Sequence, residues 1–189
     1  ILAIWLTYIL GAAVWSRPVG LAAALGLALD YDAIAAASAG LRDDAFVAAV
    51  ALCAYLMLRC WRAGRASPRV VHVGPVRVDV AYVDALVLGV AAGLTVLVRF
   101  MAFSFLLPGA AALLLTMRTS WRRRLAMASV AIVAAAVIAT PYFINCWRVY
   151  GDPLYTFNYH GNIYRVAEGQ RASSEGTAAY IGSKFAARP

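Results

Sequence analysis

The chain has 189 residues, of which 63% are hydrophobic and 14% are charged, and its mean hydropathy is +0.74. Soluble domains average about 45–50% apolar and about 25% charged residues. This composition excludes a disordered chain and an ordinary soluble enzyme, and it is typical of a helical membrane protein. The net charge of +8 suggests no nucleic-acid partner, because the arginines cluster between apolar runs, as they do in membrane proteins.

Six apolar runs approach or exceed the length of a membrane span, which takes about 20 helical residues to cross the hydrocarbon core. They lie at residues 1–15, 18–41, 45–58, 80–98, 100–117 and 125–147. None alternates like a β-strand, so they predict an all-α transmembrane bundle over residues 1–147. Residues 148–189 are polar and aromatic and predict an external loop or the start of an external domain. Because the first run begins at Ile1 without an initiator Met, we expect an internal piece of a longer chain.

The basic residues between these runs predict an orientation. If the spans simply alternate, ten arginines fall on one side of the membrane, which the positive-inside rule makes cytoplasmic. They are Arg17, Arg59, Arg62, Arg65, Arg69, Arg77, Arg118, Arg122, Arg123 and Arg124. Asp84, near the same side, is interpreted as a helix-end acid beside the basic loop. The other side then holds residues 42–44, Arg99 and the tail.

An Arg-Asp-Asp cluster, Arg42, Asp43 and Asp44, opens the third apolar run on this outer side. An Asp at a helix start caps free backbone N–H groups and complements the helix dipole, which explains one of the two acids. Ionisable groups at membrane helices are also candidates for functional sites. The sequence leaves both interpretations open.

Asp30 and Asp32 interrupt the second run, where a buried charge is costly. Either the helix breaks there, or the acids line a cavity open to the outside, or the helix is tilted and its end reaches water. Arg99 stands between two apolar runs. It either extends its charged head to the interface or binds a phosphate, whose oxygens match the guanidinium fork.

Three cysteines, Cys53, Cys60 and Cys146, have no partners at metal-ligand spacing, and we expect them to be small buried side chains. The sequence contains no phosphate-binding loop, dinucleotide-binding glycine pattern or zinc-protease motif.

Four stretches in this order carry a family resemblance: Ser-Ala-Gly-Leu-Arg-Asp-Asp-Ala-Phe at 38–46, Gly-Leu-Thr-Val-Leu-Val-Arg at 93–99, Thr-Pro-Tyr-Phe-Ile-Asn at 140–145 and Tyr-Gly-Asp-Pro-Leu-Tyr at 150–155. Together with the predicted topology, they resemble membrane glycosyltransferases of the GT-C fold. The chain looks most like the branch related to dolichyl-phosphate-mannose–protein mannosyltransferases and bacterial aminoarabinose transferases.

The resemblance implies a transferase that moves a sugar from a polyprenyl-phosphate carrier, a membrane lipid, to a glycan, lipid or protein acceptor. The site would face outward from a bacterial plasma membrane. The family's first catalytic acid would precede Ile1. Its second acid matches Asp43, with Asp44 beside it, and its arginine matches Arg99, with Arg42 as a second donor to the phosphate. A divalent metal ion at this acid is left open.

Two positions depart from the family pattern: Asp30-Tyr31-Asp32 replaces a Ser-Pro-like break, and Ile144 stands where an Arg is common. The tail carries aromatic side chains that would stack on a sugar or lipid, or form an interfacial belt. These are Tyr142, Trp147, Tyr150, Tyr155, Phe157 and Tyr159. A transporter or scaffold without enzymatic activity, or an inactive transferase homologue, is the alternative.

Overall fold

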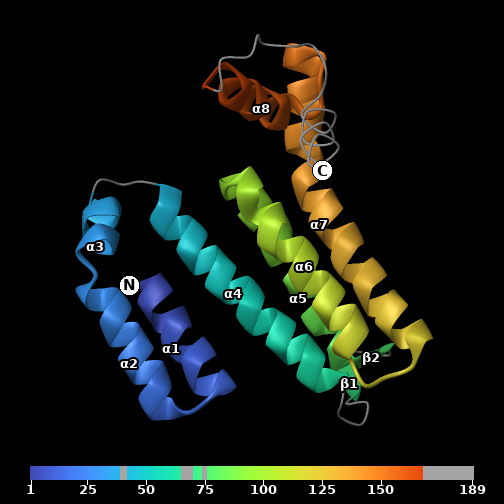
Figure 1. Cartoon of the computed structure of the whole chain (residues 1–189). Helices are drawn as coiled ribbons and strands as arrows, with labels where there is room; N and C mark the ends of the chain where they lie inside the picture. The colour runs from blue at the N-terminus through green and yellow to red at the C-terminus, as the bar shows by residue number, and fades with distance from the viewer. Residues whose placement is uncertain (39–41, 65–69, 74–75, 168–189) are drawn as a thin grey trace, which may run out of the picture. The chain divides into compact units, whose positions relative to one another are not determined.

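A computed structural model describes residues 1–38, 42–64, 70–73 and 76–167 of the chain (Figure 1). In chain order its elements are α1 (Leu2–Val14), α2 (Arg17–Leu29), α3 (Tyr31–Ser38), α4 (Arg42–Ala63), β1 (Val70–Val73), β2 (Val76–Asp79), α5 (Val80–Val98), the 3-10 helix η1 (Phe100–Ala102), α6 (Phe103–Thr116), α7 (Trp121–Tyr150) and α8 (Tyr155–Ala167). The chain forms two compact units, Ile1–Ala139 and Thr140–Pro189.

The described part of the chain is predominantly helical, as the sequence predicted. Three of its helices are long and apolar enough to cross a membrane: Ala45–Ala63, Val80–Val98 and Trp121–Tyr150. The predicted runs at 1–15, 18–41 and 100–117 contain shorter apolar helices, so six spans remain a prediction. One local element was not predicted. The basic loop contains an antiparallel hairpin that pairs Val70 with Asp79 and Val73 with Val76, and its β-branched valines favour extended backbone.

The predicted run over residues 18–41 contains a helix break at Asp30, one of the interpretations that the sequence left open. The backbone of Asp30 is extended, with φ −70° and ψ 114°, and it separates α2 from α3. The Asp30 Oδ1 accepts a hydrogen bond of 3.0 Å from the backbone N–H of Asp32. This side-chain cap satisfies an N–H group that a new helix would leave free. Of the three interpretations of these acids, the structure therefore shows a helix break.

Helix α5 lies at the centre of the first unit. Half of the apolar segment of α5 is buried within the structure, compared with 28% of that of α4 and 17% of that of α7. The fully buried Thr95 Oγ1 donates a hydrogen bond of 2.7 Å to the Ala91 carbonyl, and it lies 3.3 Å from the Cys53 Sγ of α4. The buried hydroxyl is thus satisfied. The three cysteines are free and buried, which confirms the expectation for them.

Two glycines one helical turn apart bring α5 into close contact with α7. A Cβ on Gly89 would lie 2.3 Å from the Ala131 carbonyl oxygen, and one on Gly93 would lie 2.8 Å from the Ile138 Cβ. Small residues at such crossings allow backbones to approach closely. The α7 residues next to Gly93 lie further along the chain than those next to Gly89, so α5 and α7 run parallel, with α6 connecting them.

We expect Gly89→Ala to lower the stability of the first unit by about 1–3 kcal/mol, a typical cost of overpacking a close contact. Gly26→Ala is the matched control, because a Cβ there meets nothing within 4 Å and α2 is otherwise unchanged. Thermal unfolding of both variants in detergent measures the difference. Equal melting temperatures for Gly89→Ala and wild type would contradict the contact.

Candidate functional site

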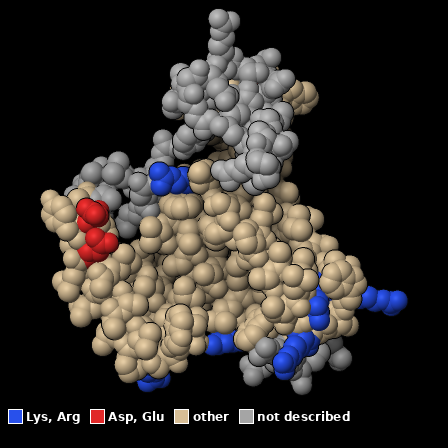
Figure 2. Space-filling model, viewed as in Figure 1, with Lys and Arg blue, Asp and Glu red and all other residues tan. Residues whose placement is uncertain are grey.

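The helices of the first unit alternate in direction, so their polar termini gather at two ends (Figure 1). We call one of them the arginine-rich end. Its described side chains are Arg17, Arg59, Arg62, Arg118, Arg122, Arg123 and Arg124. Most of the Lys and Arg atoms visible in Figure 2 lie at this lower end of the helices. The Arg62 guanidinium donates a hydrogen bond to the Ala13 carbonyl, which places the end of α1 beside the end of α4.

A buried carboxylate joins α4 to α5 near this end. Asp84 is only 6% exposed, and its Oδ1 lies 2.6 Å from an Arg59 Nη2 whose side chain is 45% exposed. A carboxylate within an apolar helix is tolerated when such a partner neutralises it. The interpretation of Asp84 as an acid beside the basic segment is consistent with this ion pair.

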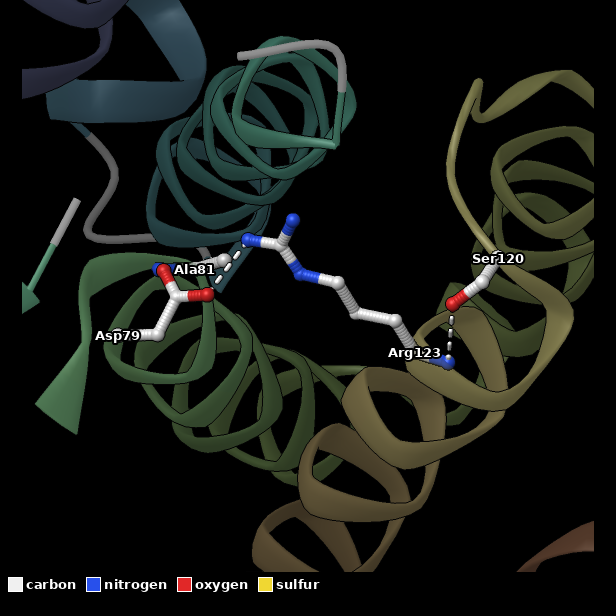
Figure 3. Close-up of polar contacts among 4 residues, drawn as sticks. All are labelled: Asp79, Ala81, Ser120 and Arg123. Carbon is white, nitrogen blue, oxygen red and sulfur yellow. Dashed lines mark hydrogen bonds and ion pairs between the residues drawn. The ribbon is translucent and has the colours of Figure 1, made fainter. Parts of the chain in front are cut away.

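Asp79 has two partners that sequence reasoning missed (Figure 3). Its Oδ1 accepts a hydrogen bond of 3.1 Å from the Ala81 N–H and caps α5, and its Oδ2 lies 2.6 Å from the Arg123 Nη2. Both side chains of this ion pair are 17% exposed. The signal for the cap was an Asp directly before the apolar run at 80–98. The partner on α7 depends on tertiary contacts that a single sequence does not reveal.

The arginines around the start of α7 divide into two kinds. Arg124 donates to the carbonyls of Leu114 and Thr119, at 2.9 and 3.0 Å, and so satisfies backbone acceptors near the end of α6. Arg118 and Arg122 are exposed. Arg123 and Arg124 therefore have structural roles, whereas the exposed pair contributes positive charge to the surface.

The opposite end of the first unit carries the sequence-predicted site, and we call it the Arg99 end. It comprises the start of α4, the end of α5 and the start of α6. Arg99 ends α5, is exposed, and its Cζ lies 5.8 Å from the centre of the Phe46 ring on α4. That ring contacts Phe105 of α6 edge to face, with centroids 6.4 Å apart. The guanidinium therefore lies over the face of an aromatic ring, whose π electrons attract its positive charge.

The structure describes the backbone of Arg42, Asp43 and Asp44 as the first turn of α4, and their side chains lie outside the described residues. Phe46 follows Asp43 by three positions, which on a helix makes the two residues neighbours on one surface. The structure thus brings Arg99 to the turn that carries these acids. Whether Asp43 or Asp44 only caps the helix remains open.

Asp30 and Asp32 are exposed on the α2–α3 segment, and neither forms an ion pair with another described residue. Asp30 has the capping role given above, and the predicted cavity for the two acids stays a prediction. Within the described ranges, no group of three or more His, Cys, Asp or Glu side chains is placed to hold a metal ion.

The second unit contains the aromatic side chains of the predicted tail. Tyr150 and Tyr155 stack with ring centroids 3.8 Å apart and planes 5° apart, and Tyr159 continues the stack at 5.8 Å. The Tyr142 hydroxyl hydrogen-bonds the Thr156 hydroxyl. These contacts fasten the end of α7 to α8.

Comparisons with protein-family models, curated proteins and solved structures found no match. The assignment of a site therefore depends on the chemistry and geometry of this chain.

The double role of Asp79 predicts a graded response to substitution. Asp79→Asn keeps a good helix cap but loses the ion pair with Arg123, so we expect a moderate loss of stability. Asp79→Ala loses the cap as well and should cost about 1 kcal/mol more. Thermal unfolding of the two variants in detergent tests this order. Equal stabilities for the two would contradict the cap, and wild-type stability for Asp79→Asn would contradict a contribution from the ion pair.

Proposed function

We propose that this chain is part of a membrane glycosyltransferase of the GT-C type, which moves a sugar from a polyprenyl-phosphate donor to an acceptor. The observation that supports it best is the contact between Arg99 and Phe46. It joins the end of α5 to the start of α4, so an arginine reaches the part of α4 whose first turn contains Asp43 and Asp44. These are the residues that the family resemblance selects.

Glycosyl transfer needs two kinds of charge close together. A carboxylate removes the proton from the acceptor hydroxyl or stabilises the positive charge that develops on the sugar. Cations hold the phosphate as it leaves with growing negative charge. In the proposed roles, the family's first acid is the base. Asp43, with Asp44 beside it, supplies a second carboxylate that orients the acceptor, holds a divalent ion or balances the arginines. Arg99, with Arg42, binds the phosphate.

The distribution of arginines supports an orientation for this reaction. The arginine-rich end has the composition of a cytoplasmic face, which would leave the Arg99 end facing outward. A polyprenyl-phosphate donor has its apolar chain in the bilayer and its phosphate at the surface. The end of an apolar helix such as α5 reaches that surface, so Arg99 would meet the phosphate without entering the hydrocarbon.

The role of Arg99 predicts a specific sensitivity to lysine. We expect Arg99→Lys to lower sugar transfer by the full-length protein by about 10- to 100-fold, because a charged hydrogen bond is worth roughly 1.5–3 kcal/mol and lysine lacks the guanidinium fork. Arg148→Lys, at the exposed end of α7, is the matched control and should keep its activity. The assay uses purified variants and a panel of labelled polyprenyl-phosphate sugars. Wild-type activity in Arg99→Lys would show that a point charge at the interface suffices.

The two interpretations of Asp43 separate cleanly in Asp43→Asn. Asparagine caps a helix about as well as aspartate, so a purely capping role predicts normal protein level and normal activity. The proposed role predicts normal level with activity lowered by about 100-fold or more, the usual scale of a lost electrostatic contact at a reacting centre. The same transfer assay measures it.

Asp44→Asn is the control for register, and we expect a weaker effect because Asp44 lies about 100° further around the helix. Full activity in both variants would leave only the cap. No transfer by the wild-type protein from any donor in the panel would favour the non-enzymatic alternative.

A further inference from the structure

A turn held by specific hydrogen bonds connects α7 to α8. Gly151 adopts a left-handed conformation with φ +71°, and its N–H donates a 2.9 Å hydrogen bond to the Trp147 carbonyl, which ends α7. Asp152 holds the turn that leads into α8: its Oδ1 accepts from the Leu154 N–H at 2.8 Å, and its Oδ2 accepts from the Asn158 Nδ2 at 2.7 Å. The Tyr-Gly-Asp-Pro stretch that contributed to the family resemblance thus has a structural role here.

This turn fixes an exposed apolar surface on the second unit. Large apolar side chains at the start of α8 and along one side of it remain accessible: Leu154 is 46% exposed, Tyr159 51% and Ile163 48%. Tyr159 and Ile163 are four residues apart and therefore share one helical face. Near the end of α7, Trp147 and Val149 are 64% and 61% exposed. A face of this kind needs a partner.

The length of α7 places this face near a bilayer surface. Thirty residues at about 1.5 Å per residue span roughly 45 Å, whereas the hydrocarbon core is only about 30 Å thick. If α7 crosses the membrane, its last turns therefore emerge into the headgroup region. Only residues 151–154 separate α7 from α8. So short a connection keeps the start of α8 within about 18 Å of the end of α7.

We propose that α8 lies in the lipid–water interface, with Tyr159 and Ile163 against the boundary between headgroups and acyl chains. The aliphatic Ile163 favours lipid over a sugar ligand, since carbohydrate recognition would need ring faces rather than an aliphatic side chain. The Tyr155 ring, moreover, is already stacked between Tyr150 and Tyr159. Tyr and Trp prefer this depth because their rings are apolar and their polar groups reach water. The proposal depends on α7 crossing the membrane, not on glycosyl transfer.

Nitroxide labels in the full chain, reconstituted into phosphatidylcholine–phosphatidylglycerol vesicles, test this arrangement. One cysteine is introduced at a time, as Ile163→Cys or, for the matched control, Asn162→Cys, whose side chain lies about 100° around α8 from Ile163. The native cysteines are buried, and the unsubstituted chain measures any label that they take up. Electron paramagnetic resonance then compares collisions with oxygen, which is enriched in lipid, and with a water-soluble nickel chelate.

We expect the oxygen-to-nickel collision ratio at position 163 to be several-fold higher than at position 162. Nickel collisions at 163 as frequent as those at 162 would place the face in water and overturn the proposal. Low collision rates with both reagents would place a protein partner on the face and would also overturn it. Because no sugar transfer is measured, failure here is distinguishable from failure of the proposed enzymatic function.

Discussion

The close approach of α5 to α7 at Gly89 and Gly93 is the constraint on which the arrangement of the long helices depends. With a carbonyl oxygen of α7 only 2.3 Å from the place of a Gly89 Cβ, no other residue fits without a shift. With this contact the two helices are parallel, and both begin at the same end of the unit. Asp79 and Arg123, far apart in the sequence, can therefore form an ion pair.

The same packing determines where charge is found. Along α5 the buried polar groups are few and satisfied: Asp84 has Arg59, and Thr95 has the Ala91 carbonyl. Otherwise the charged side chains of the first unit that the structure describes lie at or near helix ends. Breaking such a pair in a low-dielectric interior leaves an uncompensated charge, so each partner restricts the other. The polar chemistry of this unit is consequently concentrated at its two ends, and Arg99 belongs to the end with fewer arginines.

Hydropathy predicted the helices well wherever an apolar run ended at a charged residue. The run at 80–98 coincides with α5 because Asp79 caps one end and Arg99 follows the other. Over 18–41 it gives one continuous run, but the acids Asp30 and Asp32 left a helix break open, and the structure has that break at Asp30. Hydropathy missed the valine-rich hairpin, whose four-residue strands are too short for a periodicity signal. Of the candidate site, the sequence suggested which residues carry the chemistry. The contact of Arg99 with Phe46 needed the fold, because 53 positions separate the two residues.

The account depends most on the two ends of the first unit facing opposite sides of a membrane. Labelling with a membrane-impermeant maleimide in intact and permeabilised cells tests this directly, using Arg118→Cys at the arginine-rich end and Asp32→Cys on α3. Both positions are exposed, whereas the native cysteines are buried. The account predicts that position 32 reacts in intact cells and that position 118 reacts only after permeabilisation. Reaction of position 118 in intact cells would contradict it, because the Arg99 end would then face the cytoplasm.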